Sequence, residues 1–209
     1  VLLKQPRNLG MVGNFNACLS AATGALFLLL SDDDLLDPTA VERLMAPFHT
    51  PFEGLSPTAV GLSWGPCRIV NGEGAYLWNS LGGPVRESAL DFILEMFNGN
   101  RGPRFCSIML RTEDAVSMGG YNENRYGPLC DMGSWVNIAL RYDQVVCMKE
   151  PVATYTMHPA SETSQGVLQV WVSGAENIND DVAHWLRARE DVKGQKRLRT
   201  AGMNHISNA

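Results

Sequence analysis

Residues 25–34 read Ala-Leu-Phe-Leu-Leu-Leu-Ser-Asp-Asp-Asp, a run of six apolar residues that ends in charge. Six residues are too few for a buried helix, so the run predicts a strand that is buried on both faces. Strands of this kind occur in α/β proteins, where ligands gather at the carboxyl ends of the strands. The aspartates therefore stand where such a protein binds its ligand.

The aspartates crowd four carboxylates into six residues, namely Asp32, Asp33, Asp34 and Asp37. Like charges this close repel one another, so folding them together requires a compensating cation. Carboxylate oxygens are hard ligands that suit Mg²⁺ or Mn²⁺. We expect Asp32 and Asp33 to serve a cation site, whereas Asp37, which precedes Pro38, fits the N-cap of the next helix.

Apolar spacing predicts helices and strands on both sides of this stretch. Helices are expected over residues 11–22, from Pro38 onward, 86–97, 112–118, 131–142 and from about Ser164 to Arg199, and strands over 59–70, 76–78, 105–110, 144–148 and 152–156. This order predicts an α/β fold with a mostly parallel central sheet flanked by helices and a C-terminal helical extension. We assign residues 1–163 to the domain and residues 164–209 to the extension.

The composition describes one compact domain, or one and a half. The 209 residues are 45% hydrophobic and 19% charged, which excludes a disordered chain, collagen and a disulfide-rich miniprotein. The longest apolar run has six residues, against about 20 in a membrane-spanning helix. Five scattered cysteines without a Cys-x-x-Cys pair predict neither a disulfide framework nor a zinc site, and they favour a reducing, cytoplasmic location.

Charge is distributed unevenly along the chain. There are 22 acidic and 17 basic residues, yet residues 187–199 hold six basic side chains and two acidic ones. The body of the protein is therefore acidic, which makes it a poor general binder of nucleic acid, and no nucleic-acid partner is expected. The basic tail fits a solvated helix end, with peripheral contact to an anionic membrane surface as the alternative.

Asp131 opens a predicted helix, where a carboxylate caps the helix and interacts favourably with its dipole. Its spacing from Trp135 places both residues on one helix face, so Asp131 can instead point into a pocket. The residues alone leave both roles open. Trp64, Trp78 and Trp135 could offer flat faces to a ligand, but core packing is the preferred interpretation for each.

Residues 33–37 also spell Asp-Asp-x-x-Asp, the metal-binding pattern of isoprenoid synthases. In that family the pattern lies within a long helix of an all-helical fold. Here a strand-like run precedes the pattern and Pro38 follows it, which argues against a continuous helix. An isoprenoid-type enzyme is therefore a remote alternative.

An ordered set of short motifs extends over roughly residues 1–163. The set comprises Asn8-x-Gly10, Asn16, Ala22-x-Gly24, Leu28 to Asp34, Pro38, Arg111, Gly119-Gly120-Tyr121-Asn122-Glu123, Asp131-x-x-x-Trp135, Arg141, Glu150-Pro151, Tyr155 and His158. In order and spacing it resembles the inverting family 2 glycosyltransferases, GT-A-fold enzymes that use nucleotide-diphosphate sugars. The resemblance implies transfer of a sugar to an acceptor hydroxyl, with a glycan or a lipid-linked sugar as acceptor.

The resemblance also implies roles on the donor side. The residues implied in nucleotide-sugar binding are Asn8, Gly10, Asn16, Asp32 and Asp33. Asp33 would be the direct ligand of Mg²⁺ or Mn²⁺, with Asp34 in support and His158 completing the metal or diphosphate site. Ser31 stands where relatives often have an aspartate, so this chain has one charge fewer for holding the metal.

On the acceptor side, the resemblance makes Asp131 the general base that takes the proton from the attacking hydroxyl. Relatives commonly have Glu-Asp at this point and this chain has Cys130-Asp131, so the base is kept without its acidic neighbour. Gly119, Gly120, Tyr121 and Trp135 are expected to line the acceptor side. The glycine pair fits a tight turn that lets the backbone approach a ligand.

Family members begin with a strand, a helix and a second strand whose aspartates hold the nucleobase and ribose. Nothing before Val1 corresponds to this half-site, and we expect the chain to be part of a longer protein rather than a truncated relative. A chain that truly starts at Val1 should bind nucleotide weakly or not at all. The alternative function is therefore that of a degenerate, non-catalytic relative that binds sugars or a partner.

Overall fold

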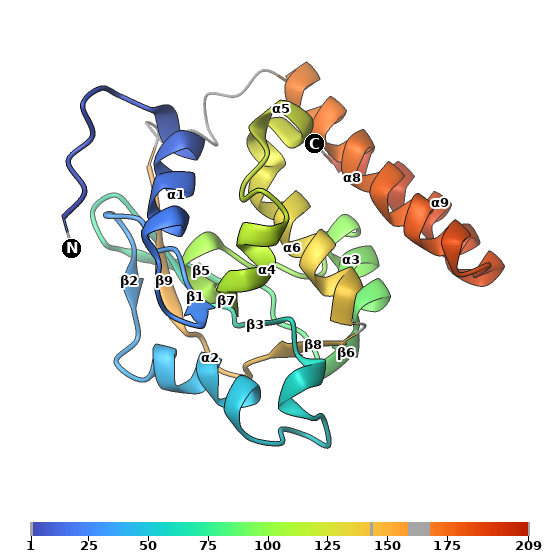
Figure 1. Ribbon diagram of the computed structural model, residues 1–209, viewed down its shortest axis with the longest axis horizontal. Coiled ribbons are helices and arrows are strands. Elements are labelled where there is room, and N and C mark those ends of the chain that lie inside the picture. Colours follow the sequence, from blue (N-terminus) through green and yellow to red (C-terminus); the bar gives the residue numbers. More distant parts are fainter. Residues whose placement is uncertain (1, 143, 159–167, 209) are drawn as a thin grey trace.

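A computed structural model describes the backbone of residues 2–142, 144–158 and 168–208 and the side chains of these residues up to Ala201. Two sheets lie at its centre, with helices packed around them (Figure 1). The five-stranded sheet has the order β1-β7-β3-β8-β6 and consists of β1 Leu26–Phe27, β3 Leu62–Trp64, β6 Arg86–Ser88, β7 Ile108–Arg111 and β8 Gln144–Cys147. The four-stranded sheet has the order β2-β9-β4-β5 and consists of β2 Leu35–Leu36, β4 Cys67–Asn71, β5 Tyr76–Asn79 and β9 Ala153–Met157.

The helices alternate with these strands along the chain. They are α1 Gly10–Ala21, α2 Ala40–His49, α3 Ala89–Phe97, α4 Thr112–Ser117, α5 Glu123–Tyr126, α6 Cys130–Tyr142, α8 Leu168–Ala188 and α9 Val192–Asn208, with 3₁₀ turns η1 Pro57–Ala59, η2 Phe105–Ser107 and η3 Gly127–Leu129. The α/β class with sheets flanked by helices is confirmed, and C-terminal helices are present.

The expectation of a mostly parallel sheet is wrong for the described strands. Only the pairs β3–β8 and β4–β9 are parallel, and the other five are antiparallel. Strand β7, for example, runs antiparallel to both of its neighbours, β1 and β3. An apolar run shows that a strand is buried but not in which direction its neighbours run, and this is why the sequence misled.

The start of the helix after the aspartates also differs from the prediction. Helix α2 begins at Ala40 after Thr39, and the carboxylate of Asp37 does not cap it. Instead Asp37 accepts two hydrogen bonds from the guanidinium of Arg68 on β4, at 2.6 and 3.2 Å, and lies 3.5 Å from Arg43. The charge of Asp37 is therefore paired with arginines of the protein itself, and the ion pair with Arg68 links the start of α2 to the four-stranded sheet.

The Asp-Asp-x-x-Asp pattern lies on extended chain rather than on a helix. Its two central residues, Leu35 and Leu36, form β2, which pairs with β9. Carboxylates spaced along a strand do not share one helix face. The structure thus contradicts the isoprenoid alternative.

Helices α8 and α9 run side by side (Figure 1) and share the main apolar core with the rest of the chain. Helix α8 packs against α5 and α6, and α9 packs against α3. Ile178, Val182 and Leu186 of α8 are completely buried in that core. The predicted boundary between residues 163 and 164 lies outside the described residues. The described helices of the extension are nevertheless part of the same packed body.

The basic tail is partly engaged within the protein. Arg197 of α9 pairs with Asp91 of α3 at 2.5 Å, and the guanidinium of Arg189 lies 4.0 Å from the centre of the Trp185 ring. Membrane contact through this tail stays a prediction. In the described part of the chain, no helix is both long and apolar enough to span a bilayer.

If α8 belongs to the common core, truncating its buried face should destabilise the whole protein. Leu186 is 0% exposed and Leu168, at the other end of the helix, is 61% exposed. We expect Leu186→Ala to lower the free energy of unfolding by about 2–4 kcal/mol, because it leaves a cavity. Leu168→Ala is the matched control and should change it by at most about 0.5 kcal/mol. Equal effects in urea unfolding would contradict a shared core.

Candidate functional site

The loop that carries the aspartates is folded onto β9. The buried carboxylate of Asp34 accepts a hydrogen bond from the backbone N–H of Thr156 at 3.0 Å, and the Thr156 hydroxyl donates to the carbonyl oxygen of Asp33 at 2.6 Å. Backbone pairing of Leu35 with Thr154 continues the contact. The loop is thus fixed to the strand that leads to His158.

This contact brings Asp33 and His158 together. His158 Nε2 lies 2.9 Å from Asp33 Oδ2, and both side chains are about one-third exposed, at 34% and 38% respectively. The two residues are separated by 125 positions in the sequence. They therefore form a small, solvent-accessible pair with one oxygen and one nitrogen ligand atom.

Asp34 has a different role in the structure from its neighbour. Its side chain points inward, where burial raises its pKa, while the Thr156 N–H and the Cys106 thiol stabilise the ionised form. Cys106 is itself buried, with its sulfur 4.0 Å from that of Cys67. Asp34 therefore fixes the loop from its buried side. Asp32, in contrast, is exposed.

The Asp33–His158 pair fits a divalent ion that is completed by other ligands. Octahedral ligands about 2.1 Å from an ion stand about 3 Å apart, which matches the spacing of these two atoms. Among the described residues, no group of three or more His, Cys, Asp or Glu side chains is arranged to hold a metal. Mg²⁺ is often held by one or two carboxylates together with waters and substrate phosphates, so two protein ligands are enough.

Asp131 is the second carboxyl of interest, and it lies in the first turn of α6. Its Oδ1 accepts a hydrogen bond from the Met132 N–H at 2.6 Å. Burial raises the pKa of Asp131 to about 6, although the Met132 N–H and the positive charge of Arg104 act in the opposite direction. A carboxyl with this pKa is ionised at neutral pH and still basic enough to accept a proton.

Asn16 connects α1 to the loop before α5. Its side-chain amide donates to the carbonyl oxygen of Tyr121 at 2.9 Å and accepts from the Tyr121 N–H at 2.8 Å. Gly120 has a φ of +78°, and a Cβ atom there would collide with the amide oxygen of Asn16. Both polar atoms of Asn16 are therefore used to hold the Gly119–Gly120 turn. A cavity of about 260 Å³ opens beside Gly120.

The aromatic residues expected on the acceptor side are packed in a cluster. Tyr121 and Trp135 are buried, and both contact the ring of Phe105, with ring centres 5.4 and 5.7 Å apart respectively. Their faces are covered by protein in this structure. Trp64 is fully buried as expected, but Trp78 on the edge strand β5 is 48% exposed, so the expectation of core packing is wrong for Trp78.

At the other end of the motif set, Asn8 and Gly10 make a local contact. The side-chain oxygen of Asn8 accepts a hydrogen bond from the Gly10 N–H at 2.8 Å, just where α1 begins. Gly10 has a φ of +72°, which glycine tolerates without strain. Both residues are exposed. The contact shapes the entry into α1, and their part in nucleotide binding stays a prediction.

Sequence reasoning missed Arg104, which precedes η2. Its guanidinium lies 5.5 Å from the centre of the Tyr155 ring on β9, and its charge lowers the pKa of both Asp34 and Asp131. The residue therefore lies between the two carboxyl sites. An arginine in a loop is an ordinary feature of a sequence, and only the packing of η2 against β9 and α6 reveals its position.

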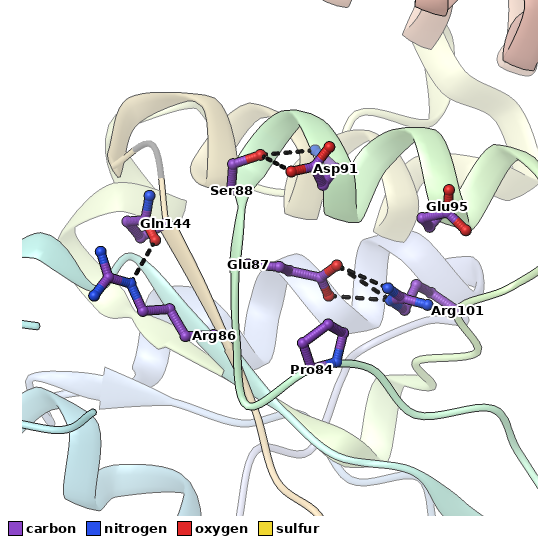
Figure 2. A pocket seen from close by; sticks show the side chains of 8 residues that line it. All are labelled: Pro84, Arg86, Glu87, Ser88, Asp91, Glu95, Arg101 and Gln144. Carbon is purple, nitrogen blue, oxygen red and sulfur yellow. Dashed lines mark hydrogen bonds and ion pairs between the residues drawn. The ribbon is translucent and has the colours of Figure 1, made fainter. Parts of the chain in front are cut away.

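A larger, open cavity of about 550 Å³ lies at the β6 edge of the five-stranded sheet, opposite the β1 edge that leads to the aspartates. Figure 2 shows Glu87 and Arg101 facing one another, Arg86 turned toward Gln144 and Ser88 turned toward Asp91. Arg101 holds the buried carboxylate of Glu87 with hydrogen bonds of 3.0 to 3.3 Å, and Ser88 donates to Asp91 at 2.6 Å. Charged side chains that line this cavity are thus paired with other lining residues, and we assign these pairs a role in stabilising the fold.

Three comparisons with known proteins give matches to this chain. Residues 1–102 match the family model described as Glycosyl transferase family 2. The chain is 25% identical over 180 residues to the uncharacterized protein MT1568 of Mycobacterium tuberculosis, covering 80% of this chain and 53% of that protein. It superposes on the crystal structure of S. aureus TarS 1-349 in complex with UDP with a TM-score of 0.50 at 13% identity, covering 80% of this chain and 44% of that one. The chain thus spans about half the length of the proteins it matches, and its fold is similar to that of TarS.

The Asn16 clamp makes a prediction about the two neighbouring glycines. Both have positive φ, but a Cβ on Gly119 meets nothing within 4 Å, whereas one on Gly120 meets Asn16. Gly119→Ala should therefore cost only the backbone strain, about 1–2 kcal/mol. Gly120→Ala should also break the two Asn16 hydrogen bonds and cost about 3 kcal/mol or more. Thermal unfolding that ranks the two variants equally would show that the clamp contributes little.

Proposed function

We propose that this chain, as a domain of glycosyltransferase family 2, transfers a sugar from a nucleotide-diphosphate sugar to an acceptor hydroxyl with inversion of the anomeric carbon. The observation that carries the proposal is a pair of carboxyls in opposite environments. Asp33 is exposed next to His158, whereas Asp131 is half-buried and its pKa is raised to about 6. Asp33 is suited to binding a cation, and Asp131 is suited to proton transfer.

In the proposed reaction, the acceptor oxygen attacks the anomeric carbon from the side opposite the diphosphate. The new carbon–oxygen bond forms as the bond to the diphosphate breaks, and the diphosphate leaves with the electron pair. Asp131 takes the proton of the acceptor hydroxyl, as a general base does. A single base is enough, because an inverting displacement forms no covalent glycosyl-enzyme.

Asp33 and His158 would hold the divalent ion, Mg²⁺ or Mn²⁺, close to the diphosphate. When bound, the ion stabilises the negative charge that the leaving diphosphate gains. Asp34 and Thr156 would keep Asp33 in place, because they fix the loop to β9. Asp32 would lie nearer the ribose, and Asn8 and Gly10 would contribute to the nucleotide side.

On the acceptor side, the structure supports a positioning role for several of the expected residues. Asn16, which was expected to bind the nucleotide sugar, instead holds the turn formed by Gly119 and Gly120, while Tyr121 and Trp135 pack close to the start of α6. We propose that this packing fixes the direction of Asp131 toward a glycan or lipid-linked acceptor. The basic tail could then contact the membrane that carries such a lipid.

The test of this function is the pH dependence of sugar transfer. A base with a pKa of about 6 is protonated and inactive below that pH, so the rate should rise with pH and level off above about 7. Asp131→Asn should lower the rate by at least about 100-fold and leave donor binding unchanged. Asp114→Asn is the matched control, because Asp114 instead pairs with Arg141 and Tyr142.

A stability measurement separates loss of the base from loss of the fold. The pKa of Asp131 is higher in the folded than in the unfolded protein, so the protonated form stabilises the fold at low pH. This stabilisation is lost as the pH rises through about 6. Asp131→Asn should therefore raise the free energy of unfolding at pH 7 by about 1–3 kcal/mol. A stable Asp131→Asn variant with full turnover would refute the base, and donor binding without transfer by the native protein would favour the non-catalytic alternative.

A further inference from the structure

We propose that Arg104 joins the two halves of the site by binding the donor diphosphate with the guanidinium that packs on Tyr155. The identity of the anion rests on the proposed function. The position of the guanidinium rests on the structure alone.

The backbone of Arg104 is held firmly at the start of η2. Its N–H donates to the buried hydroxyl of Ser107 at 3.0 Å, and that hydroxyl is also 3.0 Å from the carbonyl oxygen of Arg104. One guanidinium nitrogen donates to the carbonyl oxygen of Pro103 at 3.0 Å. The side chain therefore projects from a fixed point.

Turn η2 contacts both halves of the site through consecutive residues. The guanidinium of Arg104 packs on Tyr155 of β9, one residue before the Thr156 that fixes the aspartate loop. The ring of Phe105 packs on Trp135 of α6, one turn after Asp131. A rigid turn that touches both elements places Arg104 between the pair Asp33–His158 and the base.

The charge of Arg104 is available for a ligand. Its guanidinium lowers the pKa of both Asp34 and Asp131 but forms no ion pair with a carboxylate of residues 2–142, 144–158 or 168–201. The other titratable groups that the structure places near Asp131 are the Cys130 thiol and the Tyr121 hydroxyl, both of which stay neutral because their pKa values are raised. Among the described residues, Arg104 is thus the cation whose charge acts on the Asp131 carboxyl. Guanidinium groups bind phosphate oxygens in a two-point geometry.

Sharing one cation between two anions couples donor binding to the strength of the base. A diphosphate that engages the guanidinium weakens its hold on the Asp131 carboxylate, and the pKa of Asp131 rises toward the value that burial alone would give. Asp131 then becomes a stronger base when the donor is in place. By linkage, the ionised form of Asp131 must oppose diphosphate binding to the same extent.

The coupling can be tested without any sugar transfer, by carbon-13 NMR titration of the Asp131 carboxyl with inorganic pyrophosphate and Mg²⁺ as the probe. Arg104→Gln should raise the pKa of Asp131 by about 0.5–1. Arg86→Gln is the matched control, because Arg86 is exposed at the far β6 edge, and it should leave that pKa unchanged. Pyrophosphate should raise the pKa in the native protein and in Arg86→Gln but not in Arg104→Gln.

Arg104→Lys distinguishes charge from geometry. It should keep the native pKa of Asp131, since the charge remains, but bind pyrophosphate about tenfold more weakly, since the two-point contact is lost. An unchanged Asp131 pKa in Arg104→Gln, or an equal response to pyrophosphate in that variant, would overturn the inference. If these results hold while sugar transfer is absent, the proposed function fails and the role of Arg104 as an anion-binding residue stands.

Discussion

The hydrogen bonds between the Asp34 carboxylate, Thr156 and the backbone of Asp33 hold the candidate site together. They cross 122 and 123 positions of sequence and fix an acidic loop onto β9. Burying a carboxylate is costly, and the cost is offset here by the Thr156 N–H, the Cys106 thiol and the charge of Arg104. Without this contact Asp33 would be one solvated acid among several, and it would not face His158.

A second constraint separates the two carboxyl functions. Asp33 stays accessible next to His158, and Asp131 is half-buried in the first turn of α6, where its pKa is raised to about 6. The two aspartates are thereby suited to different tasks, Asp33 to holding a cation and Asp131 to accepting a proton. Turn η2 lies between them and carries Arg104 on one side and Phe105 on the other. The fold thus separates the two carboxyls, and we propose that the aromatic packing sets the direction in which Asp131 points.

Local sequence patterns predicted much of this arrangement. Asp131 was expected in the first turn of a helix, where it lies. The glycine pair at 119 and 120 was expected to form a tight turn, and both glycines have positive φ. Each of these features depends on residues that are close in sequence, which is why periodicity and turn chemistry could find them. The apolar run before Asp32 was predicted as a strand buried on both faces, but only Leu26–Phe27 forms β1, and Ala25 and Leu30 are exposed.

The features that could not be predicted depend on partners that are distant in sequence. Asp37 resembled a helix cap until Arg68 was found 2.6 Å from it, and Asn16 resembled a ligand-binding amide until both of its polar atoms were found on Tyr121. Strand direction is likewise a property of the assembled sheet. Arg104 had no pattern of its own, because its importance comes from η2 packing against β9 and α6.

The most direct test of the site is whether Mn²⁺, added with inorganic pyrophosphate, binds to Asp33 and His158. Electron spin echo measurements on bound Mn²⁺ should show coupling to a histidine nitrogen, and His158→Gln should remove it, whereas the exposed His184→Gln control should keep it. Asp33→Asn should weaken Mn²⁺ binding by at least about tenfold, since a charged ligand is lost. Nitrogen coupling that persists in His158→Gln, or unchanged Mn²⁺ affinity in Asp33→Asn, would show that the metal is held elsewhere and that this pair is not its site.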